Sequence, residues 1–174
     1  MQAQGGAQVN RARAALLAAC VIVGDQVTKA AVVATLAEGE SRRLIGDVLR
    51  LTHIRNTGAA FGMFRGLGGL FGLAALVGVI VFAAIIVRRP PFWTGLGASL
   101  IGAGAIGNLI DRVFRAGGVV DFVDFRFWPA FNVADSSIFV GAFVLLASNV
   151  LDRPKPTTVG PDDRDRDGDE PARD

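Results

Sequence analysis

The chain has 174 residues, of which 51% are hydrophobic and 20% are charged. This length allows one compact unit, and a formal net charge of +2 without a basic stripe argues against a nucleic-acid partner. Cys20 is the single cysteine, which excludes an internal disulfide, and it is interpreted as a buried small hydrophobic residue. The lone histidine, His53, has no second ligand nearby in sequence, so no metal site is expected.

The apolar residues form long runs. The first, Ala14–Ala37, is interrupted only by four polar residues, Asp25, Gln26, Thr28 and Lys29. Leu67–Val87 and Phe92–Ile110 follow without any charge, and Ser136–Leu151 is a shorter fourth run. Because about 20 helical residues cross a hydrocarbon core about 30 Å thick, we predict four membrane-spanning helices. The fold class is therefore an all-α membrane protein.

Two long connections separate these helices. In the first, alternation over residues 48–55 predicts a short strand, and the glycine-rich residues 57–64 suit a short helix in the membrane interface. The second, residues 111–134, carries an aromatic run that we interpret as an interfacial belt: Phe122, Phe125, Phe127, Trp128 and Phe131. Between the second and third helices, the four residues 88–91 force an antiparallel hairpin.

We divide the chain into an N-terminal extension (1–13), a four-helix membrane domain (14–151) and a disordered polar tail (152–174). Four spans place the two long connections on one side, and the hairpin turn and both termini on the other. Lysines and arginines number nine on the terminal side and eight on the other side within residues 11–173. Only the adjacent Arg88 and Arg89 favour a cytoplasmic hairpin.

The unusual polar residues gather on the side of the two long connections, which suggests a site there. Asp121 and Asp135 each follow an apolar stretch, so each carboxyl is expected in a partly desolvated place. Two such carboxylates brought together share a proton, and the charged one can activate water while the neutral one polarises a carbonyl. The alternative interpretation is a helix cap for Asp135 and a turn for Asp121.

Two further groups have helical spacing. Asn108, Asp111 and Arg112 share one helix face, where Arg112 could hold a substrate carbonyl or lipid phosphate, or form an ion pair with Asp111 or Asp124. Asp25 and Lys29 lie one turn apart, and we expect an intramembrane ion pair, with a lipid-headgroup contact as the alternative.

Five motifs in this order resemble the signatures of lipoprotein signal peptidase (signal peptidase II): DQVTK (25–29), NTGAAF (56–61), GNLIDR (107–112), VVDF (119–122) and FNVADS (131–136). The resemblance covers roughly residues 14 to 151. It implies an aspartic endopeptidase that cleaves a prolipoprotein signal peptide before a cysteine already carrying diacylglycerol.

The resemblance also assigns roles. It implies Asp121 and Asp135 as catalytic residues, with dyad support or substrate binding by six others: Asn56, Asn108, Arg112, Asn132, Asp25 and Lys29. It places a small β-cradle and an interfacial helix on the extracytoplasmic face with the active site, and both termini in the cytoplasm, in the inner membrane of a bacterium. No metal or organic cofactor is needed, and we expect a monomer among membrane lipids.

Two other classes of function remain as alternatives. Intramembrane carboxylates also mark ion paths, so a small proton-coupled transporter or channel is one. Clustering of the polar residues on one face, and the lack of inverted repeats in the sequence, argue against it. A structural protein assembled through the glycine-rich third helix is the other, but it leaves the polar motifs unexplained.

Overall fold

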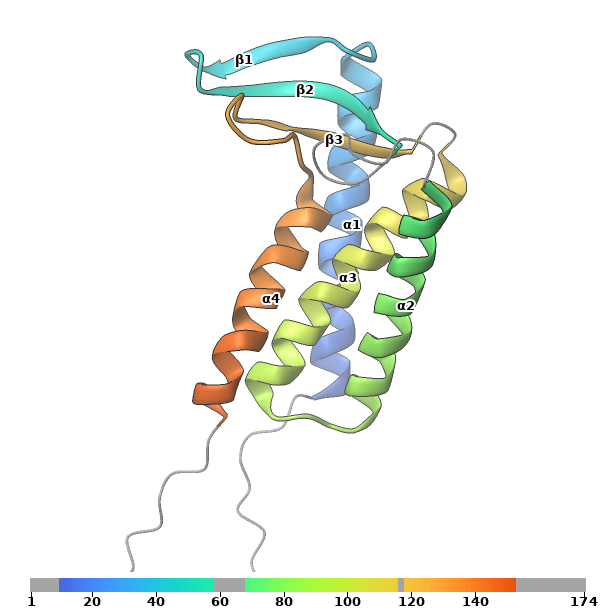
Figure 1. Cartoon of the computed structure of the whole chain (residues 1–174), viewed down its shortest axis with the longest axis vertical. Coiled ribbons are helices and arrows are strands. Elements are labelled where there is room, and N and C mark those ends of the chain that lie inside the picture. The colour runs from blue at the N-terminus through green and yellow to red at the C-terminus, as the bar shows by residue number, and fades with distance from the viewer. Residues whose placement is uncertain (1–9, 58–67, 116–117, 153–174) are drawn as a thin grey trace, which may run out of the picture.

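A computed structural model describes residues 10–57, 68–115 and 118–152. Within these ranges four helices form a bundle: α1 (Arg11–Thr35), α2 (Gly68–Val87), α3 (Phe92–Phe114) and α4 (Val133–Leu151). A three-stranded antiparallel sheet covers one end of the bundle: β1 (Ser41–Ile45), β2 (Leu49–Asn56) and β3 (Val119–Asp124) (Figure 1). The α2–α3 turn, the start of α1 and the end of α4 lie at the opposite end, as the order of the connections predicted.

Each predicted apolar run forms a helix, although the boundaries differ. By length and composition, α1 and α3 could each cross a membrane, whereas the apolar stretches found in α2 and α4, Ala75–Val87 and Val133–Asn149, are shorter. Helix α1 starts at Arg11 rather than Ala14, because the Asn10 side chain accepts a hydrogen bond from the Ala12 N–H at 2.8 Å and caps the helix.

Two other boundaries matter for the site. Helix α3 continues past the expected end at Ile110 to Phe114, so Asp111 and Arg112 are helical residues. Helix α4 starts at Val133, three residues earlier than predicted, which puts Asp135 in its first turn. In both cases the apolar run is shorter than the helix, because polar residues at the helix end form hydrogen bonds or ion pairs inside the protein.

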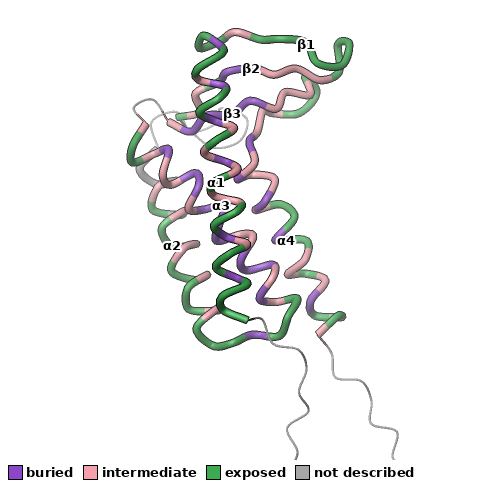
Figure 2. Tube along the Cα trace, turned by 180° about the vertical axis from the view of Figure 1, so that it is seen from behind, coloured by how far each residue is buried: buried purple, intermediate pink, exposed green. Residues whose placement is uncertain are grey.

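Helix α3 lies between its neighbours, and its small residues permit close contact. A Cβ added at Gly97 would lie 2.8 Å from the carbonyl oxygen of Gly141 in α4, and one added at Gly102 would overlap the ring of Phe82 in α2. Small residues are what allow helix backbones to approach in this way inside lipid. Buried positions follow α3, whereas exposed positions follow the outer faces of the other helices (Figure 2).

The outer faces of the helices are apolar. Large hydrophobic side chains that are more than half exposed occur on α1, α2 and α4, including Leu16, Val23, Ile80, Phe139, Phe143 and Leu146. An exposed apolar surface of this extent suits contact with lipid rather than water. Cys20 also lies on this exposed surface, so its predicted burial inside the protein is wrong. The surface thus supports the interpretation as a membrane protein.

The sheet contains one predicted strand and two that were not predicted. The predicted strand at 48–55 is β2, with bounds shifted by one residue. Strand β3 comes from the second long connection and pairs with β2 in the register Ile54 to Asp121. Phe122 in β3 is only 7% exposed and packs with Val32 and Leu36, so its assignment to an interfacial aromatic belt is wrong. Alternation along β3 sends this ring to the core.

Some predictions concern residues that the structure does not describe. Nearly all of the interfacial segment predicted at 57–64 lies outside the described residues, and so does the tail from residue 153 onward. The N-terminal extension is described only from Asn10.

Candidate active site

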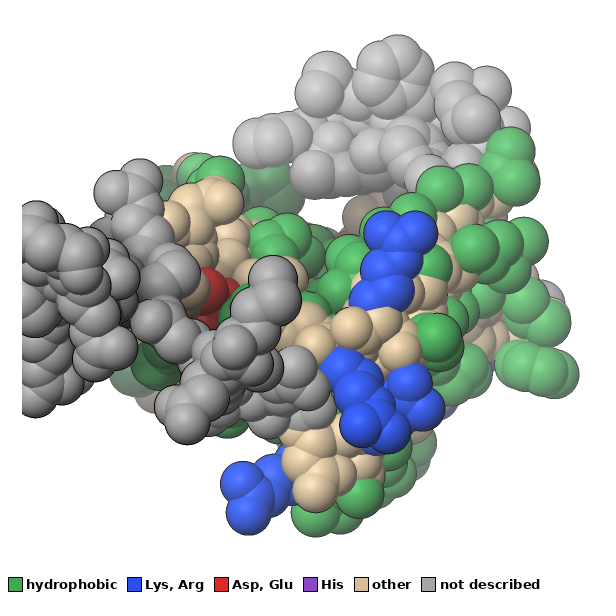
Figure 3. Space-filling model, turned by 90° about the horizontal axis from the view of Figure 1, so that it is seen from below, with side chains coloured by type: hydrophobic (Ala, Val, Ile, Leu, Met, Phe, Trp, Pro, Cys, Tyr) green, Lys and Arg blue, Asp and Glu red, His purple; other side chains and the backbone are tan. Residues whose placement is uncertain are grey.

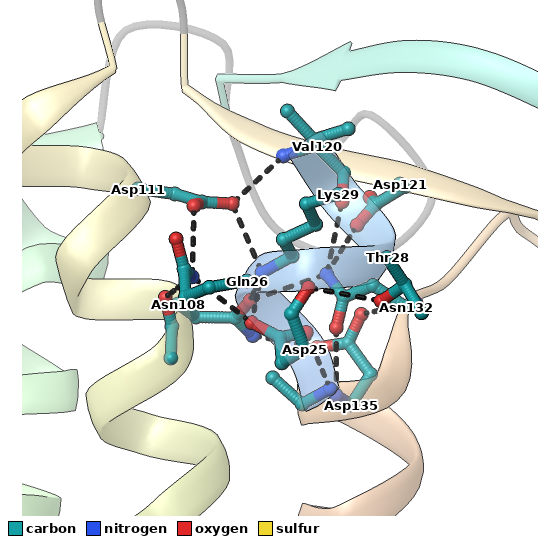
Figure 4. A network of polar contacts seen from close by, with 12 residues as sticks. Asp25, Gln26, Thr28, Lys29, Asn108, Asp111, Val120, Asp121, Asn132 and Asp135 are labelled. Carbon is teal, nitrogen blue, oxygen red and sulfur yellow. Dashed lines mark hydrogen bonds and ion pairs between the residues drawn. The ribbon is translucent and has the colours of Figure 1, made fainter. Parts of the chain in front are cut away.

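Polar side chains from α1, α3, β3, α4 and the segment before α4 meet just below the sheet (Figure 4). Asp121, Asn132, Asn108 and Asp135 form one hydrogen-bonded group, and Lys29 lies next to it. The fold therefore joins residues as far apart in the sequence as Lys29 and Asp135 at one place.

Asp121 is held by two amides. The Nδ2 of Asn56 in β2 donates to one carboxyl oxygen at 2.9 Å, and the Nδ2 of Asn132 donates to the other at 2.7 Å. The side chain is 3% exposed. Burial, reinforced by the charge of Asp135, raises the pKa of Asp121 to about 7. Asp121 can therefore carry a proton near neutral pH.

Asp135 faces the same place from the first turn of α4. Its two carboxyl oxygens accept hydrogen bonds from the Nδ2 of Asn108 at 2.8 Å and from the backbone N–H of Asn132 at 3.2 Å. The N-terminal end of a helix also carries a partial positive charge. These donors stabilise a negative charge on Asp135.

Asn132 connects the two aspartates. It is fully buried, its Nδ2 donates to Asp121, and its Oδ1 accepts a hydrogen bond from the backbone N–H of Asp135 at 2.9 Å. A single amide thus fixes both carboxyl groups relative to one another. The two carboxyls are thus neighbours with different hydrogen-bond partners, an arrangement that lets a pair of carboxyls share a proton.

A cavity of about 750 Å³ opens beside the two aspartates. Asn56 and Arg112 also line it, and the rest of its wall is mostly apolar, made by Phe125, Phe127, Trp128, Pro129, Ala130, Phe131, Ile138, Phe139, Val140 and Ala142 together with Ser136. The mixture of two carboxyls, one guanidinium and an apolar wall suits a substrate that has both a peptide bond and an apolar part.

Beside the dyad lies a closed cluster of four charged groups. The Lys29 Nζ is 2.8 Å from Asp25 and 2.9 Å from Asp111, and all three side chains have no exposed surface. The Arg115 guanidinium is 3.0 Å from the other oxygen of Asp111. The expected Asp25–Lys29 ion pair is therefore confirmed, and it is part of a larger cluster.

This cluster changes the interpretation of Arg112. Asp111 pairs with Lys29 and Arg115, and Asp124 accepts hydrogen bonds from Thr52 and from the backbone of Arg126. Arg112 instead donates to the Asn108 carbonyl oxygen at 3.2 Å and lines the cavity. The structure therefore favours a guanidinium available at the cavity wall over an ion pair with Asp111 or Asp124.

Two members of the site were not singled out from the sequence. The Nε2 of Gln26 donates to Asp111 at 3.2 Å and to the Gly107 carbonyl oxygen at 3.1 Å, which joins α1 to α3. Gln26 stands in the first motif, and Arg115 stands four residues after Asp111, so position in a motif and helical spacing were the available signals. No three histidine, cysteine, aspartate or glutamate side chains in the described part of the chain are placed to hold a metal ion.

Comparison with known proteins decides the family. Residues 17–151 match the model of the family described as signal peptidase (SPase) II. This chain belongs to the signal peptidase II family. The lipoprotein signal peptidase of Rhodococcus jostii is 44% identical over 143 residues, which cover 78% of this chain and 71% of that protein. The lipoprotein signal peptidase of Pelotomaculum thermopropionicum is 44% identical over 137 residues, covering 75% and 86%.

Solved structures agree with the family. A bacterial membrane enzyme determined by the in meso method at 2.3 Å resolution superposes with a TM-score of 0.75 at 32% identity, covering 85% of this chain and 96% of that one. The chain is thus a signal peptidase II protease with a helical membrane-enzyme fold. The resemblance found in the five motifs is confirmed at the level of family and enzyme class.

Proposed function

We propose that this signal peptidase removes the signal peptide from diacylglyceryl-modified prolipoproteins, cleaving before the lipidated cysteine. The proposed catalytic groups are Asp121 and Asp135, and the observation that carries the proposal is their convergence on one cavity with Asn132 between them. Family membership supports the substrate class, since relatives at 44% identity are named lipoprotein signal peptidases.

The geometry supports a division of labour between the two carboxyls. Asp135, with its donors and its helix end, is the ionised base that removes a proton from a water molecule, and the resulting hydroxide adds to the scissile carbonyl carbon. Asp121 carries the proton and gives it to the carbonyl oxygen, which produces a neutral tetrahedral diol. Collapse of the diol breaks the C–N bond: the proton taken by Asp135 passes to the leaving amine, and Asp121 recovers its proton from a diol hydroxyl.

The remaining residues bind and orient. Asn56, Asn108 and Asn132 donate to the dyad, and Arg112 can hold a substrate backbone carbonyl or a lipid phosphate from the cavity wall. Where the cavity runs along α4, its wall is apolar and suits the acyl chains of a lipidated substrate. A substrate already confined to the bilayer meets the enzyme in two dimensions.

The proposed setting is the inner membrane of a bacterium, with four membrane crossings, a monomeric enzyme surrounded by lipid, and both termini in the cytoplasm. The sheet is then an extracytoplasmic cradle over the active site. Arg11, Arg13, Arg88 and Arg89 are exposed at the other end of the bundle, where Lys and Arg side chains gather (Figure 3). Positive charge at this end favours its cytoplasmic placement. Residues 1–13 and 152–174 would flank the catalytic domain.

The test uses purified protein in detergent with a diacylglyceryl-modified prolipoprotein, and cleavage followed by gel shift and mass spectrometry. Asp121→Asn and Asp135→Asn should each slow cleavage by roughly 10²-fold or more while the protein stays folded. Asp124→Asn is the matched control, because Asp124 lies on the same strand as Asp121 but makes its contacts with Thr52 and the Arg126 backbone. Full activity in either dyad variant would eliminate the dyad.

Lipid recognition has its own test. An unmodified prolipoprotein of the same sequence should be cleaved far more slowly than the diacylglyceryl form. Equal rates for the two substrates would argue against acyl chains in the cavity while leaving the protease assignment in place.

A further inference from the structure

Lys29 is enclosed by three acceptors. Its ammonium group contacts Asp25 at 2.8 Å, Asp111 at 2.9 Å and the Oδ1 of Asn108 at 3.0 Å, and the side chain has no exposed surface. The first two contacts balance charge within the closed cluster. The third leads out of the cluster to the dyad (Figure 4).

The chemistry of an ammonium group determines how Asn108 is oriented. An ammonium can only donate hydrogen bonds, so the amide oxygen of Asn108 must face Lys29. The amide nitrogen then points the other way, where it donates to Asp135 at 2.8 Å. Rotation of this amide by half a turn would place nitrogen against the ammonium and oxygen against the carboxylate, which is unfavourable at both ends.

The same constraint passes to a second amide. The Oδ1 of Asn108 also accepts a hydrogen bond from the Nδ2 of Asn132 at 3.1 Å, and this Nδ2 donates to Asp121 at 2.7 Å. The Oδ1 of Asn132 is thereby turned toward the backbone N–H of Asp135 at 2.9 Å. One donor-only group is thus enough to orient two amides in series.

We infer that Lys29 is a positioning residue for the reaction: it fixes the orientation of Asn108 and Asn132 so that both amide nitrogens face the two carboxyls. Lys29 does this from α1 and reaches the two aspartates through the amides. The inference rests on the proposed function. It adds the reason why the amide nitrogens, and not the amide oxygens, face the two carboxyl groups. A purely structural Lys29 would support the fold equally well but would not control how the dyad binds protons.

The pH profile distinguishes the two roles. With Lys29 replaced, Asn108 can turn its oxygen toward Asp135, and the ionised form of the dyad loses a donor. The charged and titratable groups that face this region are Asp25 and Lys29 from α1, Asp111, Arg112 and Arg115 from α3, Asp121 from β3 and Asp135 from α4. Loss of the donor moves the acidic limb of the rate profile to higher pH.

The experiment compares two double variants that share one change. Lys29→Met with Asp111→Asn, and Arg115→Met with Asp111→Asn, each remove one positive and one negative charge from the closed cluster. They differ in which cation is lost, and the Lys29 variant also leaves Asp25 without its ion-pair partner, so a variant at Asn108 is needed to separate the amide from this charge. In the Lys29 variant the acidic limb of kcat should move up by about one pH unit, which lowers kcat about tenfold on that limb, with KM changed less than about twofold. The Arg115 variant should melt at a lower temperature and keep the wild-type limb.

A further variant allows the inference to be tested even if the double variants do not fold. Asn108→Leu leaves both ion pairs of Lys29 intact and removes only the amide, so it should move the acidic limb in the same direction. Identical limbs in both double variants, or a wild-type limb in Asn108→Leu, would overturn the inference. Failure of the proposed function is a separate outcome, because it would appear as an inactive wild type or an active Asp135→Asn variant.

Discussion

Among the described residues, two pairs of aspartates lie a short distance apart in the polar network, and their surroundings are opposite. Asp25 and Asp111 lie in the closed cluster, where Lys29 and Arg115 neutralise them. Asp121 and Asp135 lie at the cavity, where their hydrogen-bond partners are amides and a backbone N–H. Across the described residues, no lysine or arginine nitrogen is within ion-pair distance of Asp121 or Asp135.

The comparison shows how one residue type takes two roles. A buried carboxylate next to an ammonium has its charge compensated and supports the fold, whereas burial without an ion-pair partner raises the pKa of Asp121. Lys29 and Arg115 form ion pairs with Asp25 and Asp111, the structural pair, and not with the dyad. Asp121 and Asp135 therefore remain able to exchange a proton. Proton transfer needs such an equilibrium, because a carboxylate held by an ion pair is a weak base.

The largest effect is expected at the dyad. Asp135→Asn and Asp121→Asn should each lower kcat by roughly 10²- to 10⁴-fold, because each removes a proton donor or acceptor from the reaction. Their melting temperatures should stay at or above the wild-type value, since a neutral amide replaces a buried acid. A strongly lowered melting temperature would instead assign the residue to the structural pair.

The structural pair should respond in the reverse way. Asp111→Ala removes partners of Lys29 and Arg115 and leaves a buried ammonium with less compensation, which should destabilise the fold by roughly 3–5 kcal/mol. Denaturation in detergent, followed by circular dichroism, measures this change. The activity of the sample should fall in proportion to its folded fraction. A fully stable but inactive variant would contradict the division into two pairs.

The pH dependence sharpens the comparison. Because burial and the charge of Asp135 raise the pKa of Asp121 to about 7, kcat/KM should fall above pH 7 by roughly tenfold per pH unit as the proton is lost from the free enzyme. The folded state binds this proton more tightly than the unfolded state, whose ordinary pKa is 3.8. The stabilisation from Asp121 is therefore fully present below pH 3.8 and is lost as pH rises to about 7.

The check compares the wild type with Asp121→Asn across this range. Between pH 4 and pH 7 the wild type should lose stability relative to the variant, and above about pH 7 the difference should be constant. A wild type that gains stability relative to the variant as pH rises would place Asp121 among the ion-paired aspartates.

Helix packing away from both pairs gives a smaller effect. Gly97→Ala would place a methyl carbon 2.8 Å from the Gly141 carbonyl oxygen, and separating α3 from α4 to make room should cost about 1–3 kcal/mol. Ala is otherwise a better helix former than Gly, so a stabilised variant would show that the two backbones are not in close contact. The folded fraction should keep wild-type kcat, measured after correction for the amount of folded protein.

The smallest effect is expected for a charged pair on the sheet. Arg43 and Asp47 are 3.6 Å apart and both are mostly exposed. Water screens such a pair, so Arg43→Gln should change neither the melting temperature nor kcat beyond experimental error. Arg43 is the residue to replace because Asp47 also contacts the less exposed Arg50 at 3.4 Å. A clear loss of activity would show that this hairpin takes part in substrate binding.

Sequence reasoning located the four helices because each long apolar run can satisfy its backbone within a helix. It missed β1, the hairpin partner of β2, and it missed β3. For β3 the reason is that a short strand depends on a pairing partner distant in sequence, since β3 joins β2 across more than 60 residues. The valines and the phenylalanine in Val119–Asp124 were a local signal for β3, but the aromatic residues after it favoured a different interpretation. Phe122 was misplaced for this reason.

The sequence by itself determined the family, the helical membrane fold and the aspartates that could share a proton, because these depend on residue types in motifs and on the length of apolar runs. Only the tertiary structure decided which aspartates are neutralised and which are not. Asp111 and Arg112 are neighbours in the chain, yet one faces Lys29 and the other lines the cavity. The reason is that charge pairing in a low-dielectric interior depends on distance and direction between side chains, which packing of α1, α3, β3 and α4 sets.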